Sequence, residues 1–217
     1  MNTNKILNDI NTSGKPYIIY RTSKGFDLFT NFSKKIILSN NNVVNFLKSI
    51  SSNKKKIKKT DLYIGFFGYE LLNHLIGIKF PKQKNNQFPK GIFYKPETLL
   101  KLNENLSFKT ESIEKKYKNF KININKKSYT KIFNKFKKRI QQGDTYQIKI
   151  CTKYKNKSKI DPLDFFCRLS KSNLAPEAFL IKDKNYSVIS CSPETLIEKK
   201  GRSIITKPIA GTLKKNT

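Results

Sequence analysis

Short apolar runs separated by turn-forming residues dominate the first half of the chain. The runs rich in β-branched and aromatic residues, which are typical of strands, are 16–21, 26–29, 35–38, 91–94, 99–102 and 106–110. Between them, residues 43–50 have the pattern of a short helix, and residues 62–76 predict a strand that enters a helix. Gly65 and Gly68 lie in that segment and allow two backbones to approach closely. We therefore expect a sheet accompanied by helices in this half.

The clearest helical periodicity of the sequence follows Ser128. Apolar residues recur there at steps of three and four: Tyr129, Ile132, Phe133, Phe136 and Ile140. Lysines fill the positions between them, so the segment predicts an amphipathic helix. Ser128 is expected to cap its N-terminus, and Gly143 is expected to end it.

Residues 145–155 alternate between apolar and polar side chains, which predicts a strand with one buried face. Asp161 followed by Pro162 predicts the start of another helix, which extends to about residue 170. Two hairpins are expected after it, the first from residues 178–181 and 186–190 and the second from residues 195–198 and 203–206. Strands and helices in this order predict an α+β fold with antiparallel sheets flanked by helices.

The composition is strongly basic, with 45 Lys and Arg against 15 Asp and Glu and a formal net charge of +30. Such a charge favours anionic partners, so a basic nucleic-acid-binding protein is one hypothesis for the function. Only four of the basic residues are arginines, and the lysines are scattered along the chain. Nucleic-acid readers prefer arginine for bidentate contacts, so we favour a solvated surface enriched in lysine and consider nucleic acid an unlikely partner.

Cys151, Cys167 and Cys191 are odd in number and lack the spacing of metal ligands. We therefore expect neither a disulfide framework nor a zinc site, and we expect the protein to reside in a reducing compartment. The polar N-terminus has no apolar signal segment, and the most apolar stretch, residues 62–80, contains Glu70. These features predict a cytoplasmic protein with no membrane association.

Four short motifs occur in the order found in chorismate-utilising enzymes: GFFGYE at 65–70, GDTYQI at 143–148, CSPE at 191–194 and KPIAGT at 207–212. With them the chain resembles the large subunit of anthranilate synthase and its relative, aminodeoxychorismate synthase component I. The resemblance implies a two-layer antiparallel sandwich like that of anthranilate synthase. It assigns residues 1–122 to an N-terminal region and 123–217 to the beginning of the chorismate-binding catalytic domain, with the fold incomplete at the C-terminus.

Four positions carry the chemistry that this resemblance implies. Gly211 and Thr212 would contact chorismate, a dicarboxylate, because a turn without a side chain can aim backbone N–H groups and a hydroxyl at a carboxylate. Gln147 would orient ammonia, since an amide cannot act as a general base and the relatives that add water have lysine there. Ala210 replaces the lysine with which many aminodeoxychorismate synthases attack the ring, so it favours anthranilate as the product.

The resemblance also implies partners and a cofactor. The whole enzyme would convert chorismate and ammonia to anthranilate and pyruvate with Mg²⁺, and a glutamine amidotransferase subunit would supply the ammonia. The Mg²⁺ ligands of the family lie after the position of Thr212, so none is assigned here, and the chain without the missing C-terminal half is expected to be inactive. Aminodeoxychorismate synthase component I, in folate and 4-aminobenzoate synthesis, stays open as the alternative.

A regulatory site is a further open question. Pro176, Glu177 and Ala178 occupy the place where large subunits inhibited by tryptophan have a Pro-x-Met element. Because the methionine is replaced by Ala178, the sequence leaves tryptophan feedback undecided.

Overall fold

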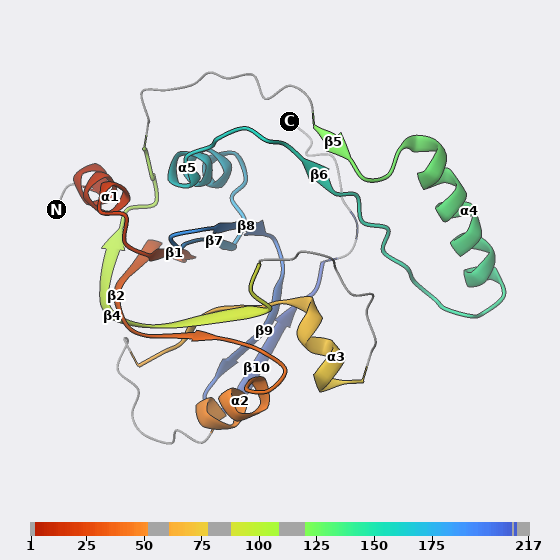
Figure 1. Ribbon diagram of the computed structural model, residues 1–217, viewed down its shortest axis with the longest axis horizontal. Coiled ribbons are helices and arrows are strands. Elements are labelled where there is room, and N and C mark those ends of the chain that lie inside the picture. The colour runs from red at the N-terminus through yellow and green to blue at the C-terminus, as the bar shows by residue number, and fades with distance from the viewer. Residues whose placement is uncertain (1–2, 52–60, 78–87, 109–119, 210, 212–217) are drawn as a thin grey trace. The chain divides into compact units, whose positions relative to one another are not determined.

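The computed structural model of the 217-residue chain describes residues 3–51, 61–77, 88–108, 120–209 and 211 (Figure 1). The chain divides into two compact units. Unit 1 comprises residues 1–109 and 161–217, and unit 2 comprises residues 110–160. The boundary between residues 122 and 123 that the sequence predicts for the catalytic domain stays a prediction.

Unit 1 is built on a six-stranded sheet in which all neighbouring strands are antiparallel. In spatial order its strands are β3 (Ile64–Phe67), β4 (Gly91–Leu102), β2 (Gly25–Ile37), β1 (Tyr17–Thr22), β7 (Glu177–Lys182) and β8 (Ser187–Ser192). With the helices described below, this arrangement confirms the predicted α+β class. The hairpin of β7 and β8 is also confirmed.

The two longest strands each join two runs that the sequence predicts as separate strands. β2 continues through Asn31, whose φ is +49°, and its register with β4 shifts between Phe32 and Lys34. A bulge of this kind bends a strand without ending its pairing. The strand predicted over residues 106–110 is wrong for residues 106–108, which are irregular, and its last two residues lie outside the described part.

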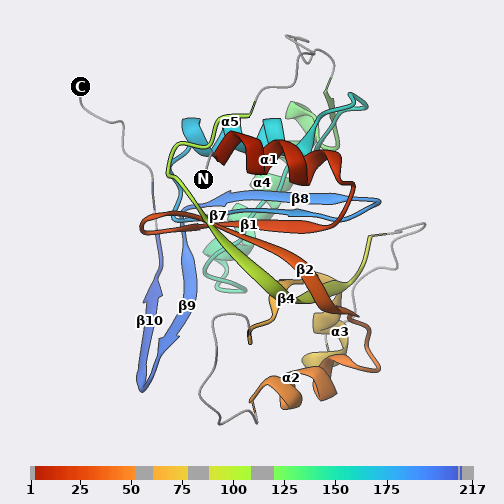
Figure 2. The ribbon, with the colours of Figure 1, turned by 90° about the vertical axis from the view of Figure 1, so that its left-hand side faces the viewer.

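Two helices, α1 (Thr3–Thr12) and α5 (Pro162–Ser172), lie side by side over β1, β7 and β8 (Figure 2). The main core lies beneath them, and its fully buried side chains include Leu7, Tyr17, Ile19, Leu28, Leu163 and Phe166. Asp161 caps α5 as predicted by accepting hydrogen bonds from the backbone N–H groups of Leu163 and Asp164. Its other oxygen accepts a hydrogen bond from Asn11 of α1, which ties the two helices together.

Smaller helices cover the other end of the sheet. α2 (Val43–Ser51) packs Val43 and Phe46 against Phe93 of β4, and the 3₁₀ helix η1 (Tyr69–Leu71) leads into α3 (Leu72–Leu75). The expected close approach at Gly65 is confirmed, because a Cβ there would lie 1.9 Å from the carbonyl oxygen of Ile92. Five of the lysines, at positions 54–56, 58 and 59, lie outside the described residues.

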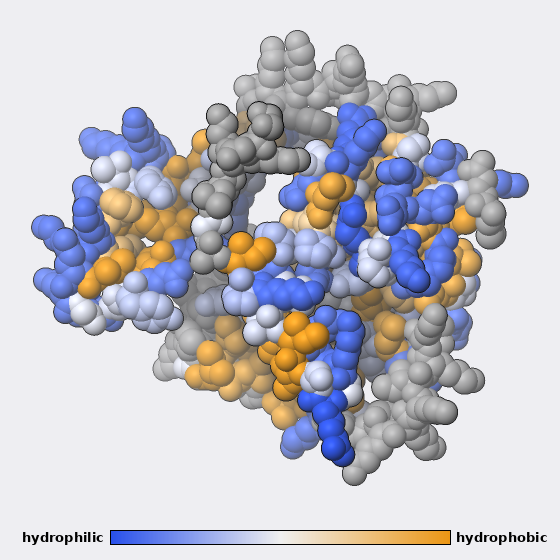
Figure 3. Space-filling model, turned by 180° about the vertical axis from the view of Figure 1, so that it is seen from behind, coloured by the Kyte–Doolittle hydropathy of each residue, from blue (hydrophilic) through white to orange (hydrophobic). Residues whose placement is uncertain are grey.

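The second predicted hairpin is confirmed as β9 (Thr195–Lys200) with β10 (Ser203–Lys207), and it forms a two-stranded sheet separate from the main one. Its turn contains Gly201, whose φ is +59°. Leu196, Ile197 and Ile204 are about 70% exposed or more, and apolar side chains of this hairpin are visible at the surface in Figure 3.

Unit 2 contains α4 (Lys126–Gln141) and a short pairing of β5 (Lys121–Ile122) with β6 (Tyr154–Lys155). Asn125, and not Ser128, caps α4, because its side-chain oxygen accepts a hydrogen bond of 2.8 Å from the backbone N–H of Ser128. The strand predicted over residues 145–155 is wrong except for its end, β6. None of residues 120–160 is buried.

Among the helices that the structure describes, none combines the length and the apolar character needed to cross a membrane.

Candidate functional site

A cavity of about 570 Å³ in unit 1 brings together residues that are far apart in the sequence. Its lining includes Gly65, which belongs to the GFFGYE motif, and Ser192, which belongs to the CSPE motif. Glu177 lines it as well. β3 and β8, which carry Gly65 and Ser192, are the two edge strands of the six-stranded sheet. The sheet therefore curls until its opposite edges face the same cavity.

Glu177 is held at the wall of this cavity by two short hydrogen bonds. One carboxylate oxygen accepts from the Tyr20 hydroxyl at 2.5 Å, and the other accepts from the Thr195 hydroxyl at 2.5 Å. Burial raises the pKa of Tyr20, and its hydrogen bond to Glu177 raises the pKa further, so the phenol stays protonated and remains a donor. The contacts join β1, β7 and β9 and fix the orientation of the carboxylate.

The three residues at the place of the Pro-x-Met element, Pro176, Glu177 and Ala178, do not all face this cavity. Pro176 is exposed, and Ala178 is fully buried in the main core with Leu180. Because side chains alternate along β7, only Glu177 of the three faces the cavity.

The carboxylate-binding turn proposed from the sequence is described only in part. Gly211 has a φ of +87°, a conformation that residues with a Cβ rarely adopt, and among the described residues no atom lies within 4 Å of the place where a Cβ would stand. The space next to its Cα is therefore free of other described residues. Ala210 and Thr212 lie outside the described residues.

Gln147 is exposed in an irregular segment of unit 2, which corrects the expectation that it belongs to a strand. Its backbone carbonyl accepts a hydrogen bond of 3.2 Å from the Thr145 hydroxyl. Just before it, Arg139 and Asp144 form an ion pair of 2.7 Å across Gly143, whose φ is +79°. The GDTYQI motif is thus anchored to the end of α4. Gln147 belongs to unit 2 and Gly211 to unit 1.

Sequence reasoning missed a buried polar cluster at the turn between β7 and β8. Asp183, whose side chain is 4% exposed, lies 2.6 Å from the ammonium of Lys35 and also accepts a hydrogen bond from the Tyr94 hydroxyl. Burial alone would raise the pKa of Asp183, but these hydrogen bonds outweigh it and lower the pKa. Lys35 and Asp183 are separated by 148 positions, and Asp183 has the sequence signature of a turn residue only.

The described residues include no group of three or more His, Cys, Asp or Glu side chains that could hold a metal ion. A site for Mg²⁺ would need several oxygen ligands. The part of the chain that the structure describes therefore does not fit such a site.

Comparisons with known proteins give one consistent result. A family model described as "chorismate binding enzyme" matches residues 5–217. Anthranilate synthase component 1 of Buchnera aphidicola subsp. Rhopalosiphum maidis is 30% identical in an alignment that covers 77% of this chain and 39% of that protein. Anthranilate synthase component 1 of Aquifex aeolicus is 31% identical over 55% of this chain and 24% of its own length.

The chain thus spans about two fifths of the length of the Buchnera relative. The family model, in contrast, matches the chain from residue 5 to residue 217. On this match, the chain belongs to the family of chorismate binding enzymes.

Proposed function

We propose that this chain is part of an anthranilate synthase component 1, an enzyme that converts chorismate and ammonia to anthranilate, pyruvate and water. The observation that carries the proposal is the family match, together with relatives that are named anthranilate synthase component 1. Ala210 supports the same product, since the resemblance assigns a lysine at that position to many aminodeoxychorismate synthases.

The residues of this chain take part in binding and orientation. The positive φ of Gly211 and the free space at its Cβ position support a role in holding a carboxylate of chorismate, and Thr212 would donate its hydroxyl to the same group. Gln147 would hold ammonia through its amide oxygen, which accepts hydrogen bonds but cannot remove a proton. Ammonia would come from a glutamine amidotransferase subunit, and Mg²⁺ would bind to ligands outside the residues that the structure describes.

The experiment uses the full-length natural protein that contains residues 1–217. It is incubated with chorismate, ammonium and Mg²⁺, and anthranilate is followed by its fluorescence while pyruvate is measured in parallel. Equal amounts of anthranilate and pyruvate are expected. Failure to bind or consume chorismate would overturn the proposal.

Aminodeoxychorismate formation is the second candidate. The absence of the Pro-x-Met element at 176–178 favours it, because that element belongs to large subunits that respond to tryptophan. This reaction replaces the ring hydroxyl with an amino group and keeps the enolpyruvyl side chain. An aminated product without release of pyruvate would therefore identify it in the same assay.

A further inference from the structure

Unit 1 contains a second cavity, of about 530 Å³, which we call the α1 cavity. Residues of α1, of the loop between α1 and β1, of β2 and of β4 line it, and none of these residues lines the cavity that contains Glu177. Leu28 faces the α1 cavity and Phe29 faces the other one, because successive side chains of a strand point to opposite faces of the sheet. The two cavities are therefore separate. The volume of the α1 cavity lies within the usual range of small-molecule sites, about 300–1,000 Å³.

One part of the α1 cavity is apolar. Ile6 and Ile10 lie about one turn apart on α1 and line this part. Leu28 lines it from β2 and lies directly opposite Leu100 of β4, which lines it as well. All four side chains belong to the main core or pack against it. A wall of aliphatic side chains binds a hydrocarbon because contact removes apolar surface from water, so this part of the cavity suits the hydrocarbon body of a ligand.

The bulge in β2 brings a cation to the same face of the sheet. Leu28 and Phe32 lie on one side of the strand, and regular alternation would place Lys34 on that side next. The register with β4 shifts at this point, so Lys35 takes that side instead and stands opposite Tyr94. Lys35 and Tyr94 both line the cavity. The lining therefore follows β2 for about 20 Å, from the apolar part at Leu28 to the ammonium group of Lys35.

The loop before β1 adds a second cation on the side of Lys35. β1 pairs antiparallel with β2 from Ile18, which is opposite Phe29, so the loop that precedes β1 lies beside the part of β2 that follows Phe29. Lys15 belongs to this loop and lines the cavity. Among the described residues, its ammonium has no hydrogen-bond or ion-pair partner. Two lysines therefore reach the α1 cavity, one from β2 and one from this loop.

The two lysines retain donors for an anionic ligand. The ammonium of Lys35 lies 2.6 Å from Asp183, and it has three N–H donors, so the bond to Asp183 leaves two of them for other acceptors. Asp9 of α1 supplies the single carboxylate among the described residues of the lining, against the two ammonium groups. The net charge of +30 also attracts anions from a distance. A ligand with one negative charge therefore balances the lining.

We propose that the α1 cavity binds the anion of an unbranched fatty acid of medium length. The hydrocarbon chain lies along Leu28 and Leu100, and the carboxylate accepts hydrogen bonds from Lys15 and Lys35. The length of the cavity along β2 favours an unbranched chain over a compact ring, and the two lysines favour a carboxylate over a neutral head group. The residues of this site differ from those of the proposed function, and the proposal does not rest on that function.

Isothermal titration calorimetry of the full-length natural protein with decanoate tests the proposal, at concentrations below those at which decanoate forms micelles. We expect saturable binding of one decanoate per chain. Decanol should bind at least about tenfold more weakly, because it lacks the charge that the lysines recognise. Hexanoate should also bind at least about tenfold more weakly, because it buries four fewer methylene groups. Binding of decanoate that does not saturate would overturn the proposal.

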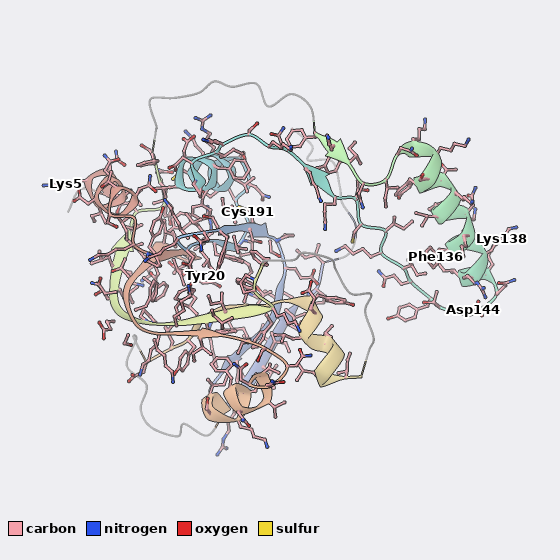
Figure 4. All side chains as sticks on the ribbon, viewed as in Figure 1. Lys5, Tyr20, Phe136, Lys138, Asp144 and Cys191 are labelled. Atoms are coloured by element: carbon pink, nitrogen blue, oxygen red, sulfur yellow. The ribbon has the colours of Figure 1, made fainter. Side chains whose placement is uncertain are left out.

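Two lysine substitutions locate the carboxylate. Lys15→Gln removes an ammonium group from the α1 cavity, and Lys5→Gln is the matched control, because Lys5 projects from α1 away from the strands (Figure 4). Lys15→Gln should weaken the binding of decanoate at least about fivefold, and Lys5→Gln should leave it within about twofold. Thermal unfolding should be the same for both variants, since neither lysine belongs to the buried core. Equal affinities of the two variants would overturn the proposal.

Methyl signals in nuclear magnetic resonance spectra locate the hydrocarbon chain. Ile6 and Ile10 line the α1 cavity, and decanoate should shift their signals. Ile18 and Ile64 line the other cavity, and their signals should stay unchanged. Shifts confined to Ile18 and Ile64 would overturn the proposal in favour of the other cavity. Tighter binding of decylamine than of decanoate, with a loss of decylamine binding in Asp9→Asn, would overturn it in favour of a cationic ligand.

Discussion

Gly211 and Gly201 place the same demand on the backbone but lie in different contexts. Both have positive φ values, +87° and +59°, and in the part of the chain that the structure describes no atom lies within 4 Å of the position that a Cβ would take at either. Gly211 belongs to the KPIAGT motif, whereas Gly201 belongs to the turn between β9 and β10. A comparison of the two therefore separates backbone strain from ligand binding.

We predict that Gly211→Ala weakens chorismate binding by the full-length protein at least about tenfold, whereas Gly201→Ala leaves it within about twofold. Each substitution should cost about 1–2 kcal/mol of local backbone strain, because L-residues disfavour this region. Only at position 211 would the strained backbone be the one that contacts the carboxylate. Equilibrium titration with chorismate measures both variants, and equal losses of affinity would remove Gly211 from the site.

Asp183 predicts a dependence of stability on pH. Its pKa is lowered in the folded chain, so its contribution to stability is present above the pKa of an unfolded aspartate, about 3.9, and is lost as the pH falls through the folded value. Asp183→Asn should lower the free energy of unfolding by about 1–3 kcal/mol at neutral pH and flatten the decline in acid. We place the loss below that of a fully buried pair because Lys35 is 43% exposed and keeps part of its water.

Urea unfolding of residues 1–217 between pH 3 and pH 7 measures this effect. Asp61→Asn is the control, because Asp61 forms a more exposed pair with Lys95 at 3.3 Å, and such pairs contribute about 0–1 kcal/mol. If Asp183→Asn and Asp61→Asn cost the same, the cluster around Asp183 does not stabilise the fold.

At the scale of elements, the cap of α4 provides a direct test. Asn125→Ala should destabilise the first turn of the helix by about 1 kcal/mol, because the backbone N–H of Ser128 would lose its acceptor. Ser128→Ala should have little effect, since only the backbone of Ser128 takes part in the cap. Hydrogen exchange at the amides of Ser128 and Tyr129 distinguishes the two variants, and a larger effect of Ser128→Ala would restore the cap expected from the sequence.

The wrong prediction of the cap shows that apolar periodicity does not locate the first turn of a helix. The apolar repeat of α4 begins at Tyr129, so the sequence alone placed the start of the helix at Ser128. The actual first turn consists of Lys126, Lys127 and Ser128, which carry no apolar signal. The apolar repeat therefore could not decide whether Asn125 or Ser128 caps the helix. By contrast, Asp161 and Pro162 marked the start of α5 correctly because both are terminal signals in themselves.

The error at residues 145–155 has a different cause. The alternation describes which side chains a strand would bury, but a strand forms only where a second strand accepts its hydrogen bonds. Residues 178–181 and 186–190 were predicted correctly because each run supplies the partner of the other in a local hairpin. A local pattern is therefore most informative where both strands of a hairpin lie within it.

At the scale of the whole molecule, the candidate site was visible in the sequence only as separate motifs. Gly65, Glu177 and Ser192 meet at one cavity because the sheet curls, and no spacing along the chain encodes that meeting. The resemblance to chorismate-utilising enzymes identified the motifs, and the topology of the six-stranded sheet explains why they lie close together. Gln147 belongs to unit 2 and Gly211 to unit 1, and a joint role of the two stays a prediction.

We predict that residues 1–217 alone release neither anthranilate nor pyruvate from chorismate, ammonium and Mg²⁺. The described residues supply no cluster of metal ligands, and Gln147 is exposed to water, where its amide cannot hold ammonia against the solvent. The full-length natural protein is the positive control at the same concentration. Formation of anthranilate by the shorter chain above the background without protein would show that these residues contain a complete active site.

If the proposed function holds, position 147 should control the choice between ammonia and water as the nucleophile. Gln147→Lys introduces an amine that can act as a base when desolvated, so part of the chorismate should react with water instead of ammonia. Gln142→Lys adds the same charge at an exposed position next to the end of α4, outside the motif, and is the matched control. In ¹⁸O-labelled water, liquid chromatography with mass detection should reveal a labelled hydroxylated isomer of chorismate only for Gln147→Lys, with a corresponding loss of anthranilate. An unchanged product ratio in Gln147→Lys would show that this side chain does not face the reacting ring, and Gln147 would then be a surface residue.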